Sequence, residues 1–515
     1  MSRRLRVHMA AALALTCAAR GGLAAQDSAP ASPPPAVERS RDAESRPAPR
    51  RATDRDPLEA FKRGDYAKAE RLLLEQLAKE PENFVPLYNL ACCRSQAKDP
   101  DGAIDYLKRA IEKGFCDIHH LRRDPTLDPI RDDARFKAIV AAWPEVLDAR
   151  RVANRRQAEI IFDDKAYVAV SDDALRLEYR SAFDPRSFEQ ARGEVARVAK
   201  FAHDQVLAGV LDEASIAEDA WVTVILPTKV DFGRWTVSTY GPSALETGNS
   251  SIGGAYEHDA KRLVSMDLGA TLRHEFFHVL HFRDATRRAQ AHPPWIQEGL
   301  SSLVEDVEAD GDSIRPVASW RTNMAKRMER RRLLMPIASL AKLPAIKFSG
   351  QRPLANYAQA RAIFLRLHEL GKLGEWYAHY VAHHERDPSG VASLEAVLGK
   401  PIAEIDVDHR AWLRDLPAVP ESIPTGGASL GVEIEGGAGD GPVITLVEKG
   451  RRRGEGASGL LMPGDVITAI DGKPTRDIAE LVRVLGAMRV GDDVKVEYRR
   501  GRRAGVADVV LTPKR

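Results

Sequence analysis

The sequence lacks the features that would place the chain in a membrane or on nucleic acid. Lysine and arginine (76) almost balance aspartate and glutamate (74), so the net charge is only +2. Nucleic-acid-binding proteins usually carry a clear positive excess, and we therefore expect no nucleic-acid partner. Beyond residue 25 no stretch reaches the ~18 consecutive apolar residues of a membrane-spanning helix. We expect no transmembrane segment in the processed chain.

Cysteine is also scarce. Only four cysteines occur among 515 residues, and Cys17 lies in the apolar run near the N-terminus. The other three, Cys92, Cys93 and Cys116, are an odd number and cannot all pair within one chain. One bridge among them is compatible with the sequence, which leaves the pairing open. They lack the paired spacing of a zinc–thiolate site, so we expect them to be structural.

The N-terminus has the three parts of a secretory signal. Arg3, Arg4 and Arg6 precede an apolar run over residues 9–19, and small residues follow up to residue 25. This order predicts a signal peptide over residues 1–25 and export to the periplasm or the extracellular space. Residues 26–56 are rich in proline, serine, alanine and arginine, which predicts a disordered linker.

The length suggests about three or four domains, at ~100–200 residues each. Residues 57–145 read as helical hairpins with a 34-residue period, in which Ala69 aligns with Ala103 and Leu73 with Leu107. This period and pattern resemble tetratricopeptide repeats. The resemblance implies a surface for a protein partner and no catalysis.

Residues 155–416 form the largest predicted unit. Strand patterns lie at residues 166–170, 175–179, 221–226 and 263–267, with a long helix predicted over residues 187–210. After residue 270 the pattern is helical to the end of the unit. Strands followed by helices predict an α+β domain.

The chemistry of this unit is concentrated in the sequence His274-Glu275-Phe276-Phe277-His278. On a helix the two histidines share one face, at a spacing that suits a tetrahedral metal, and Glu275 is placed to act as general base on a metal-bound water. Glu298 follows twenty residues after His278, in a segment that prolines begin as a new helix. A carboxylate completes a His₂Glu zinc site with one open position.

This motif followed by Trp295-Ile296-Gln297-Glu298-Gly299 resembles the gluzincin metallopeptidases. The resemblance implies Zn²⁺ held by His274, His278 and Glu298, with Glu275 as catalytic base.

The resemblance extends to residues around the zinc site. It implies Tyr357 as a donor to the transition-state oxyanion, because Tyr357 opens a helical run 59 residues after Glu298. The family often has an acid four residues after the third ligand to hold a zinc histidine, but Ser302 stands there. Glu305 lies one turn further and is the substitute that the sequence offers. Loss of such support costs ~10–100-fold in metal affinity or activity.

Residues 426–513 change to short strand patterns separated by glycine turns. Ser429-Leu430-Gly431-Val432, Pro463-Gly464-Asp465-Val466-Ile467 and Ile470-Asp471-Gly472 resemble a PDZ domain of the bacterial-protease type. The resemblance implies that Leu430, Gly431 and Val432 offer backbone N–H groups to the terminal carboxylate of a C-terminal peptide, which adds as a strand.

The sequence therefore predicts a multidomain, exported zinc metallopeptidase that cleaves peptide or protein substrates. The Phe276-Phe277 pair together with a PDZ domain is also similar to glycyl aminopeptidases, and endo- versus aminopeptidase activity stays open. One alternative is a degenerate peptidase that acts as an envelope scaffold or peptide-binding protein, and Ser302 favours it. A binding protein with structural zinc is a further alternative.

Overall fold

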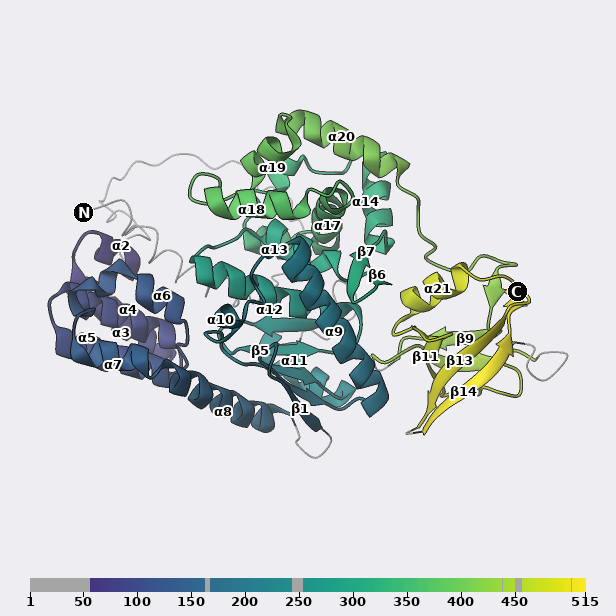
Figure 1. Cartoon of the computed structure of the whole chain (residues 1–515), viewed down its shortest axis with the longest axis horizontal. Helices are drawn as coiled ribbons and strands as arrows, with labels where there is room; N and C mark the ends of the chain where they lie inside the picture. The colour runs from purple at the N-terminus through teal and green to yellow at the C-terminus, as the bar shows by residue number, and fades with distance from the viewer. Residues whose placement is uncertain (1–55, 163–166, 243–252, 438, 450–455, 502) are drawn as a thin grey trace, which may run out of the picture. The chain divides into compact units, whose positions relative to one another are not determined.

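The computed structural model describes residues 56–162, 167–242, 253–437, 439–449, 456–501 and 503–515. The predicted signal peptide and almost all of the predicted linker lie outside these residues. The chain divides into two compact units (Figure 1). The first holds the described residues up to Cys116 and Leu121–Trp143, and the second holds Asp117–His120 and Pro144–Arg515. No helix among the described residues is long and apolar enough to cross a membrane.

The first unit is built from short helices that begin at polar caps. At α2 to α5, η2 and α7 the Asp or Asn cap accepts a hydrogen bond from a first-turn N–H, a donor that the helix itself leaves unpaired. Ala69, Leu73, Ala103 and Leu107, which the repeat period aligns, are all fully buried. The elements of this region are α2 (Pro57–Lys62), α3 (Tyr66–Lys79), α4 (Phe84–Gln96), α5 (Pro100–Glu112), α6 (Ile118–Arg123), η2 (Pro125–Ile130) and α7 (Ala134–Ala141).

The three cysteines of this region are buried and unpaired. Cys92 and Cys93 lie on α4, and Cys116 follows α5; all three carry free thiols. Burial raises the pKa of the Cys93 thiol to about 12, which keeps it protonated at neutral pH. The cysteines therefore act as small core residues.

The second unit begins with a long helix and a five-stranded sheet in the order β1-β2-β3-β5-β4. The neighbours β2–β3 and β3–β5 are parallel, and the two outer pairs are antiparallel. Strand β4 therefore lies at an edge of the sheet. The elements are α8 (Trp143–Ile161), β1 (Val168–Asp172), β2 (Leu177–Ser181), α9 (Pro185–Gln205), α10 (Glu213–Ile216), β3 (Val222–Leu226), α11 (Lys229–Tyr240), β4 (Gly254–Glu257) and β5 (Arg262–Ser265).

Both faces of this sheet are covered, which explains the unbroken apolar run of β3. Val224 and Leu226 belong to the main core, together with residues of α9 and α12. Ile225 points to the other face and packs with Phe232 and Trp235 of α11. A strand buried on both faces loses the alternation of polar and apolar residues.

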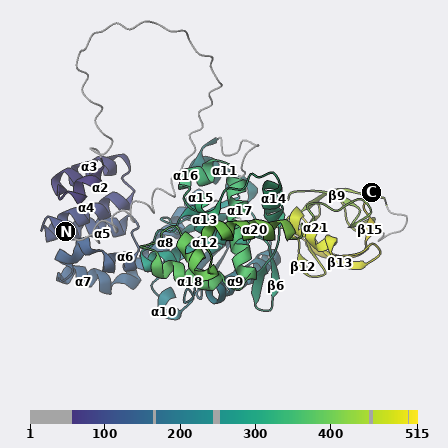
Figure 2. The same cartoon turned by 90° about the horizontal axis from the view of Figure 1, so that it is seen from above.

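The rest of the unit up to Asp415 is mainly helical (Figure 2). Its apolar side chains share the main core with those of the sheet. It also contains a two-stranded hairpin, β6–β7, where the sequence pattern predicted only helices. The elements are α12 (Ala270–Arg288), α13 (Pro294–Leu303), β6 (Val307–Asp310), β7 (Ser313–Pro316), α14 (Trp320–Arg330), α15 (Ile337–Leu340), α16 (Ala345–Gly350), α17 (Pro353–Glu369), α18 (Leu373–His383), α19 (Val391–Leu398) and α20 (Ile402–Asp415).

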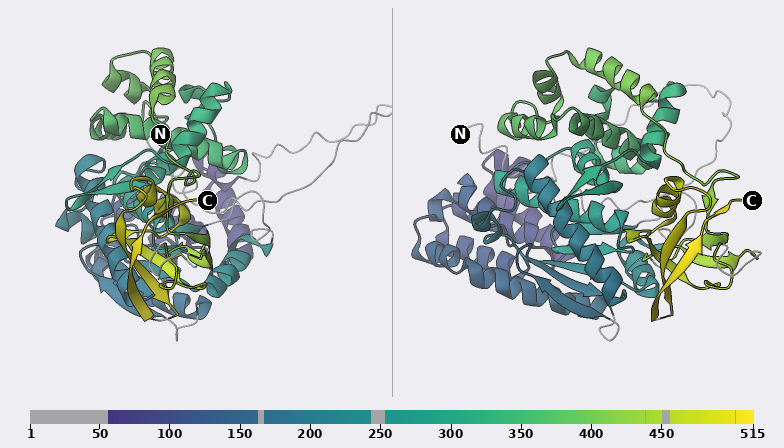
Figure 3. Two further views of the ribbon diagram at one scale, coloured as in Figure 1. Left: turned by 90° about the vertical axis from the view of Figure 1, so that its right-hand side faces the viewer. Right: turned by 45° about the vertical axis from the view of Figure 1, so that its right-hand side comes forward.

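The C-terminal region is β-rich and has its own apolar core, with one amphipathic helix (Figure 3). Its main sheet has six strands, and β9 lies at one edge, paired with β10. The elements are β8 (Ala428–Ser429), β9 (Val432–Glu435), β10 (Val443–Val447), β11 (Val466–Ile470), β12 (Lys473–Pro474), α21 (Ile478–Gly486), β13 (Asp493–Arg500), β14 (Arg503–Val510) and β15 (Thr512–Pro513). The chain is thus multidomain: helical repeats, a mixed α/β middle and a β-rich end.

The packing of α13 against α17 generates a stability prediction. A Cβ added at Gly299 would lie 2.5 Å from Cε2 of Phe364 and 3.1 Å from Cβ of Ala360, whereas one at Gly233 in α11 meets nothing within 4 Å. We expect Gly299→Ala to lower the free energy of unfolding by ~1–3 kcal/mol through overpacking. Gly233→Ala, the matched control, should be neutral or stabilising by up to ~1 kcal/mol. Equal urea midpoints for the two variants would contradict this packing.

Candidate metal centre

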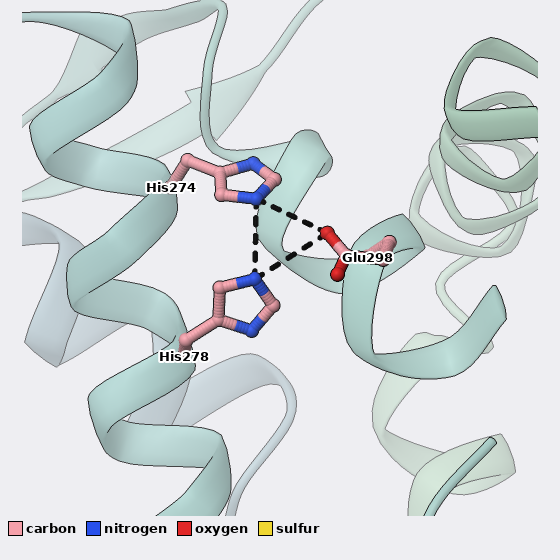
Figure 4. Close-up of side chains that lie close together, drawn as sticks. All are labelled: His274, His278 and Glu298. Carbon is pink, nitrogen blue, oxygen red and sulfur yellow. Dashed lines mark hydrogen bonds and ion pairs between the residues drawn. The ribbon is translucent and has the colours of Figure 1, made fainter. Parts of the chain in front are cut away.

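Two histidines and one glutamate converge from two consecutive helices (Figure 4). His274 and His278 project from the same face of α12, and Glu298 faces them from α13. Glu298 Oε2 lies 3.3 Å from His274 Nε2 and 3.4 Å from His278 Nε2. The two Nε2 atoms are 3.2 Å apart. One ligand atom from each of the three residues thus points at a common position.

The start of α12 is fixed by a carboxylate just before it. Asp267 Oδ1 accepts hydrogen bonds from the backbone N–H groups of Gly269 (2.8 Å) and Thr271 (3.1 Å). These bonds satisfy donors that the first turn of a helix leaves unpaired. Helix α13 begins at Pro294, whose ring suits the first position of a helix. Both ligand-bearing helices therefore have defined starting points.

In both histidines the ring nitrogen that faces away from Glu298, Nδ1, has a hydrogen-bond partner. His274 Nδ1 lies 2.9 Å from Oε1 of Glu305, and His278 Nδ1 lies 3.0 Å from Oγ of Ser301. A carboxylate only accepts, so the Nδ1–H of His274 donates to Glu305. That tautomer leaves the Nε2 lone pair free for a metal.

Glu305 is itself held as a carboxylate. Burial favours its protonated form, but Arg321 and His274 outweigh burial and lower the pKa of Glu305 to about 2. Arg321 donates from Nη2 to Oε1 of Glu305 at 2.8 Å. The charged acceptor opposite His274 is therefore stable across the physiological pH range.

Ser302, which stands where the gluzincin pattern has an acid, lies deep in the core. Its side chain is fully buried, and its Oγ has no hydrogen-bond partner among the described residues. The carboxylate opposite His274 comes instead from Glu305, just beyond the end of α13.

The charge around the three residues suits a cation. Burial opposes both the ionised Glu298 and the protonated His274, yet the pKa of Glu298 is held well below its ordinary value by the two histidines. The pKa of His274 is raised to about 10 by Glu298 and Glu305, in spite of burial. The negative charge of Glu298 and Glu305 thus attracts positive charge, either a proton or a metal ion, to Nε2 of His274. Two imidazoles and one carboxylate are also the donor set that Zn²⁺ takes in open, three-ligand sites, so the residues fit this ion.

Glu275 lies beside this group and against the edge strand. It is buried, and burial raises the pKa of its carboxyl group. A Cβ at Gly254 of β4 would lie 3.2 Å from Cγ of Glu275 and 2.5 Å from the carbonyl oxygen of Val264. Only glycine lets β4 approach this closely. Glu257, at the end of β4, is already paired with Arg262.

Tyr357 lies on the α17 side of the centre. Its ring is 6.3 Å from that of His274, and the guanidinium of Arg321 lies 5.6 Å from the Tyr357 ring centroid. Burial and the negative charge of Glu298 raise the pKa of Tyr357 well above its ordinary value. The hydroxyl therefore stays protonated and can donate a hydrogen bond.

Arg273, the residue before His274, connects α12 to several neighbouring segments. Its buried guanidinium donates to the carbonyl oxygens of Val304 (3.1 Å) and Glu305 (2.6 Å). It also pairs with Glu194 of α9 (2.7 Å) and Glu480 of α21 (2.9 Å). A buried cation with this many acceptors locks the backbone that carries Glu305.

Some backbone N–H and carbonyl groups of the loop before β9 already form hydrogen bonds within the domain. The N–H of Gly431 donates to Oγ of Ser429 at 3.0 Å, and the carbonyl oxygens of Leu430 and Gly431 accept from Ala457 and Glu448. Val432 begins β9 and pairs with Val447 of β10. Among the described residues the outer edge of β9 has no paired strand.

Sequence reasoning alone did not reach three of these positions. Ser301 and Arg321 support the histidines only through the packing of α13 and α14, and no motif marks either residue. The approach of Gly254 to Glu275 depends on the position of α12, which the sequence pattern does not give.

Comparisons with known proteins bear on the two ends of the chain. The tetratricopeptide repeat family matches residues 60–117, and the PDZ domain family matches residues 429–511. Both matches confirm the modules predicted from the sequence. Proteins with such modules generally use them to bind proteins or peptides.

The comparisons say less about the middle of the chain. No curated protein matches the chain. A solved structure of an aminopeptidase N family protein from Idiomarina loihiensis is similar over 68% of this chain and 67% of that chain, with 13% identity and a TM-score of 0.25. A likeness at that TM-score carries no argument about the fold or the activity.

The support of His274 generates a prediction about metal affinity. Glu305→Gln replaces the anionic acceptor at His274 Nδ1 and should weaken Zn²⁺ binding ~10–100-fold. Ser302→Ala removes only a hydroxyl without a partner and should leave the affinity unchanged. Competition with a chromophoric chelator measures both. The assignment of Glu305 is wrong if Ser302→Ala weakens binding as much as Glu305→Gln.

Proposed function

We propose that the chain is an exported zinc-dependent peptidase. The observation that carries the proposal is the convergence of His274 Nε2, His278 Nε2 and Glu298 Oε2, with both outer imidazole nitrogens engaged. Zn²⁺ bound there would polarise a peptide carbonyl and lower the pKa of a water molecule to ~7. Export rests on the N-terminal sequence pattern alone.

The residues around this position supply the other elements of peptide hydrolysis. Glu275, whose pKa is raised by burial, takes the proton of the attacking water and passes it to the leaving amine. The protonated hydroxyl of Tyr357 donates to the oxyanion that develops on the carbonyl. The outer edge of β4 pairs with no strand of the described residues, and Gly254 brings β4 close to Glu275. This edge aligns the substrate backbone as an added strand.

The repeats and the PDZ domain extend this proposal to partners. We expect C-terminal peptides to bind beside β9, with Leu430, Gly431 and Val432 near the terminal carboxylate. A protein partner would bind the helical repeats.

A degenerate scaffold is the competing function, and Ser302 is the residue that favoured it. Glu305 now occupies the position opposite His274 that Ser302 cannot serve. Glu275 also argues for the enzyme, because a scaffold gains nothing from a buried carboxylate beside the two histidines.

A pair of variants tests the proposal. Glu275→Gln should bind about one Zn²⁺ per chain and lose hydrolysis of a mixed peptide library, because it keeps the ligands and removes the base. Glu298→Ala should lose both the metal and the hydrolysis. Metal content is measured by atomic emission and turnover by mass spectrometry. Wild-type turnover in Glu275→Gln would contradict the proposed mechanism. Full metal retention in Glu298→Ala would show that another residue is the third ligand.

The role of Tyr357 has its own test. Tyr357→Phe removes one donor to the oxyanion and should lower kcat ~10²–10³-fold with metal content unchanged. Tyr380→Phe, which loses a 3.4 Å hydrogen bond to the carbonyl oxygen of Pro388, is the matched control and should keep its kcat. An unchanged kcat in Tyr357→Phe would assign Tyr357 to the core alone.

A further inference from the structure

The helical part of the second unit contains an apolar cavity of about 240 Å³. It lies between α15, α17, α19 and α20. Its wall is formed by isoleucine and leucine side chains, among them Ile363, Leu367 and Leu394, which are almost completely buried. Arg366 lines it nine positions after Tyr357 on α17, ~13 Å along the helix axis. The cavity is therefore separate from the metal centre.

Two buried nitrogen atoms on residues that line this cavity have no hydrogen-bond partner in the described part of the chain. His409 of α20 is 3% exposed, and its Nε2 has no hydrogen bond among the described residues. Nη1 of Arg366 is equally buried and unpaired. Leaving a buried polar group unsatisfied costs ~1–3 kcal/mol, and more for a charged one. An acceptor inside the cavity would satisfy Arg366 Nη1, which can only donate, and would satisfy His409 Nε2 in the tautomer that carries the ring proton there.

Arg366 forms no direct ion pair among the described residues, although the carboxylates of Asp408 and Glu369 act on its charge. Lys400 and Asp408, which also line the cavity, pair with each other at 2.6 Å. Burial lowers the pKa of His409 to about 3, so this imidazole is neutral and adds no charge. The guanidinium of Arg366 is left as the cation that an anion would neutralise.

We propose that this cavity binds a small aliphatic carboxylate. The alkyl chain would lie against the isoleucine and leucine wall, and the carboxylate would accept hydrogen bonds from Arg366 Nη1 and His409 Nε2. The volume is below the ~300–1,000 Å³ of pockets for drug-sized ligands, which limits the ligand to a short or medium chain. The isoleucine and leucine side chains of the wall disfavour a phosphate or sulfate, which would leave them without an apolar partner.

Titration calorimetry with octanoate on the processed full-length chain tests the proposal. We expect one site, at least tenfold weaker binding of octan-1-ol, and at least tenfold weaker binding of octanoate in Arg366→Met. The exposed Arg386→Met is the matched control and should bind as the wild type does. No octanoate binding to the wild type, or equal affinity in Arg366→Met, would overturn the proposal.

Two further measurements distinguish octanoate in this cavity from octanoate bound at another place on the chain. Glu298→Ala disables the metal centre, where a carboxylate could also bind, and should keep full octanoate affinity; loss of binding there would overturn the proposal. Octanoate should raise the Tm of the wild type and leave that of Arg366→Met unchanged. An equal rise in both would place the ligand outside the cavity and overturn the proposal as well.

Discussion

The ionised carboxylate of Glu305 is the charge on which the geometry of the candidate metal centre depends. Arg321 holds it from one side, and His274 Nδ1 donates to it from the other. If Glu305 were neutral, the proton on His274 could move to Nε2, and the lone pair that faces His278 and Glu298 would be lost. The buried ion pair of Arg321 and Glu305 thus sets the tautomer of His274, which Glu305 contacts directly.

The backbone that carries Glu305 is held as firmly as its side chain. The guanidinium of Arg273 donates hydrogen bonds to the carbonyl oxygens of Val304 and Glu305. It also forms ion pairs with Glu194 and Glu480. Arg273 directly precedes His274 on α12. It therefore links the helix that carries both histidines to the turn that carries Glu305. Removing one partner from such a buried network lowers the free energy of unfolding far more than removing one partner from a surface ion pair does.

The three residues that the sequence proposes as ligands lie together in the structure because their spacing is local. An i, i+4 histidine pair needs only one helix, and Glu298 needs only the next one. The supporting residues could not be predicted in this way: Arg321 and Ser301 reach the histidines through tertiary packing, and β4 is short and only half-buried. The β6–β7 hairpin was missed because each of its strands has only four residues and those of β6 are mostly exposed.

The position of the supporting acid has a structural consequence. An acid at Ser302 would sit inside α13 and inherit its orientation from the helix that also carries Glu298. Glu305 lies after α13 ends at Leu303, in a turn whose geometry no helix imposes. The position of Glu305 is therefore fixed by the contacts of Arg273 and Arg321 and not by a helix. A site of this kind is sensitive to any change that loosens the turn, even one remote from the metal ligands, because the orientation of His274 follows the position of Glu305.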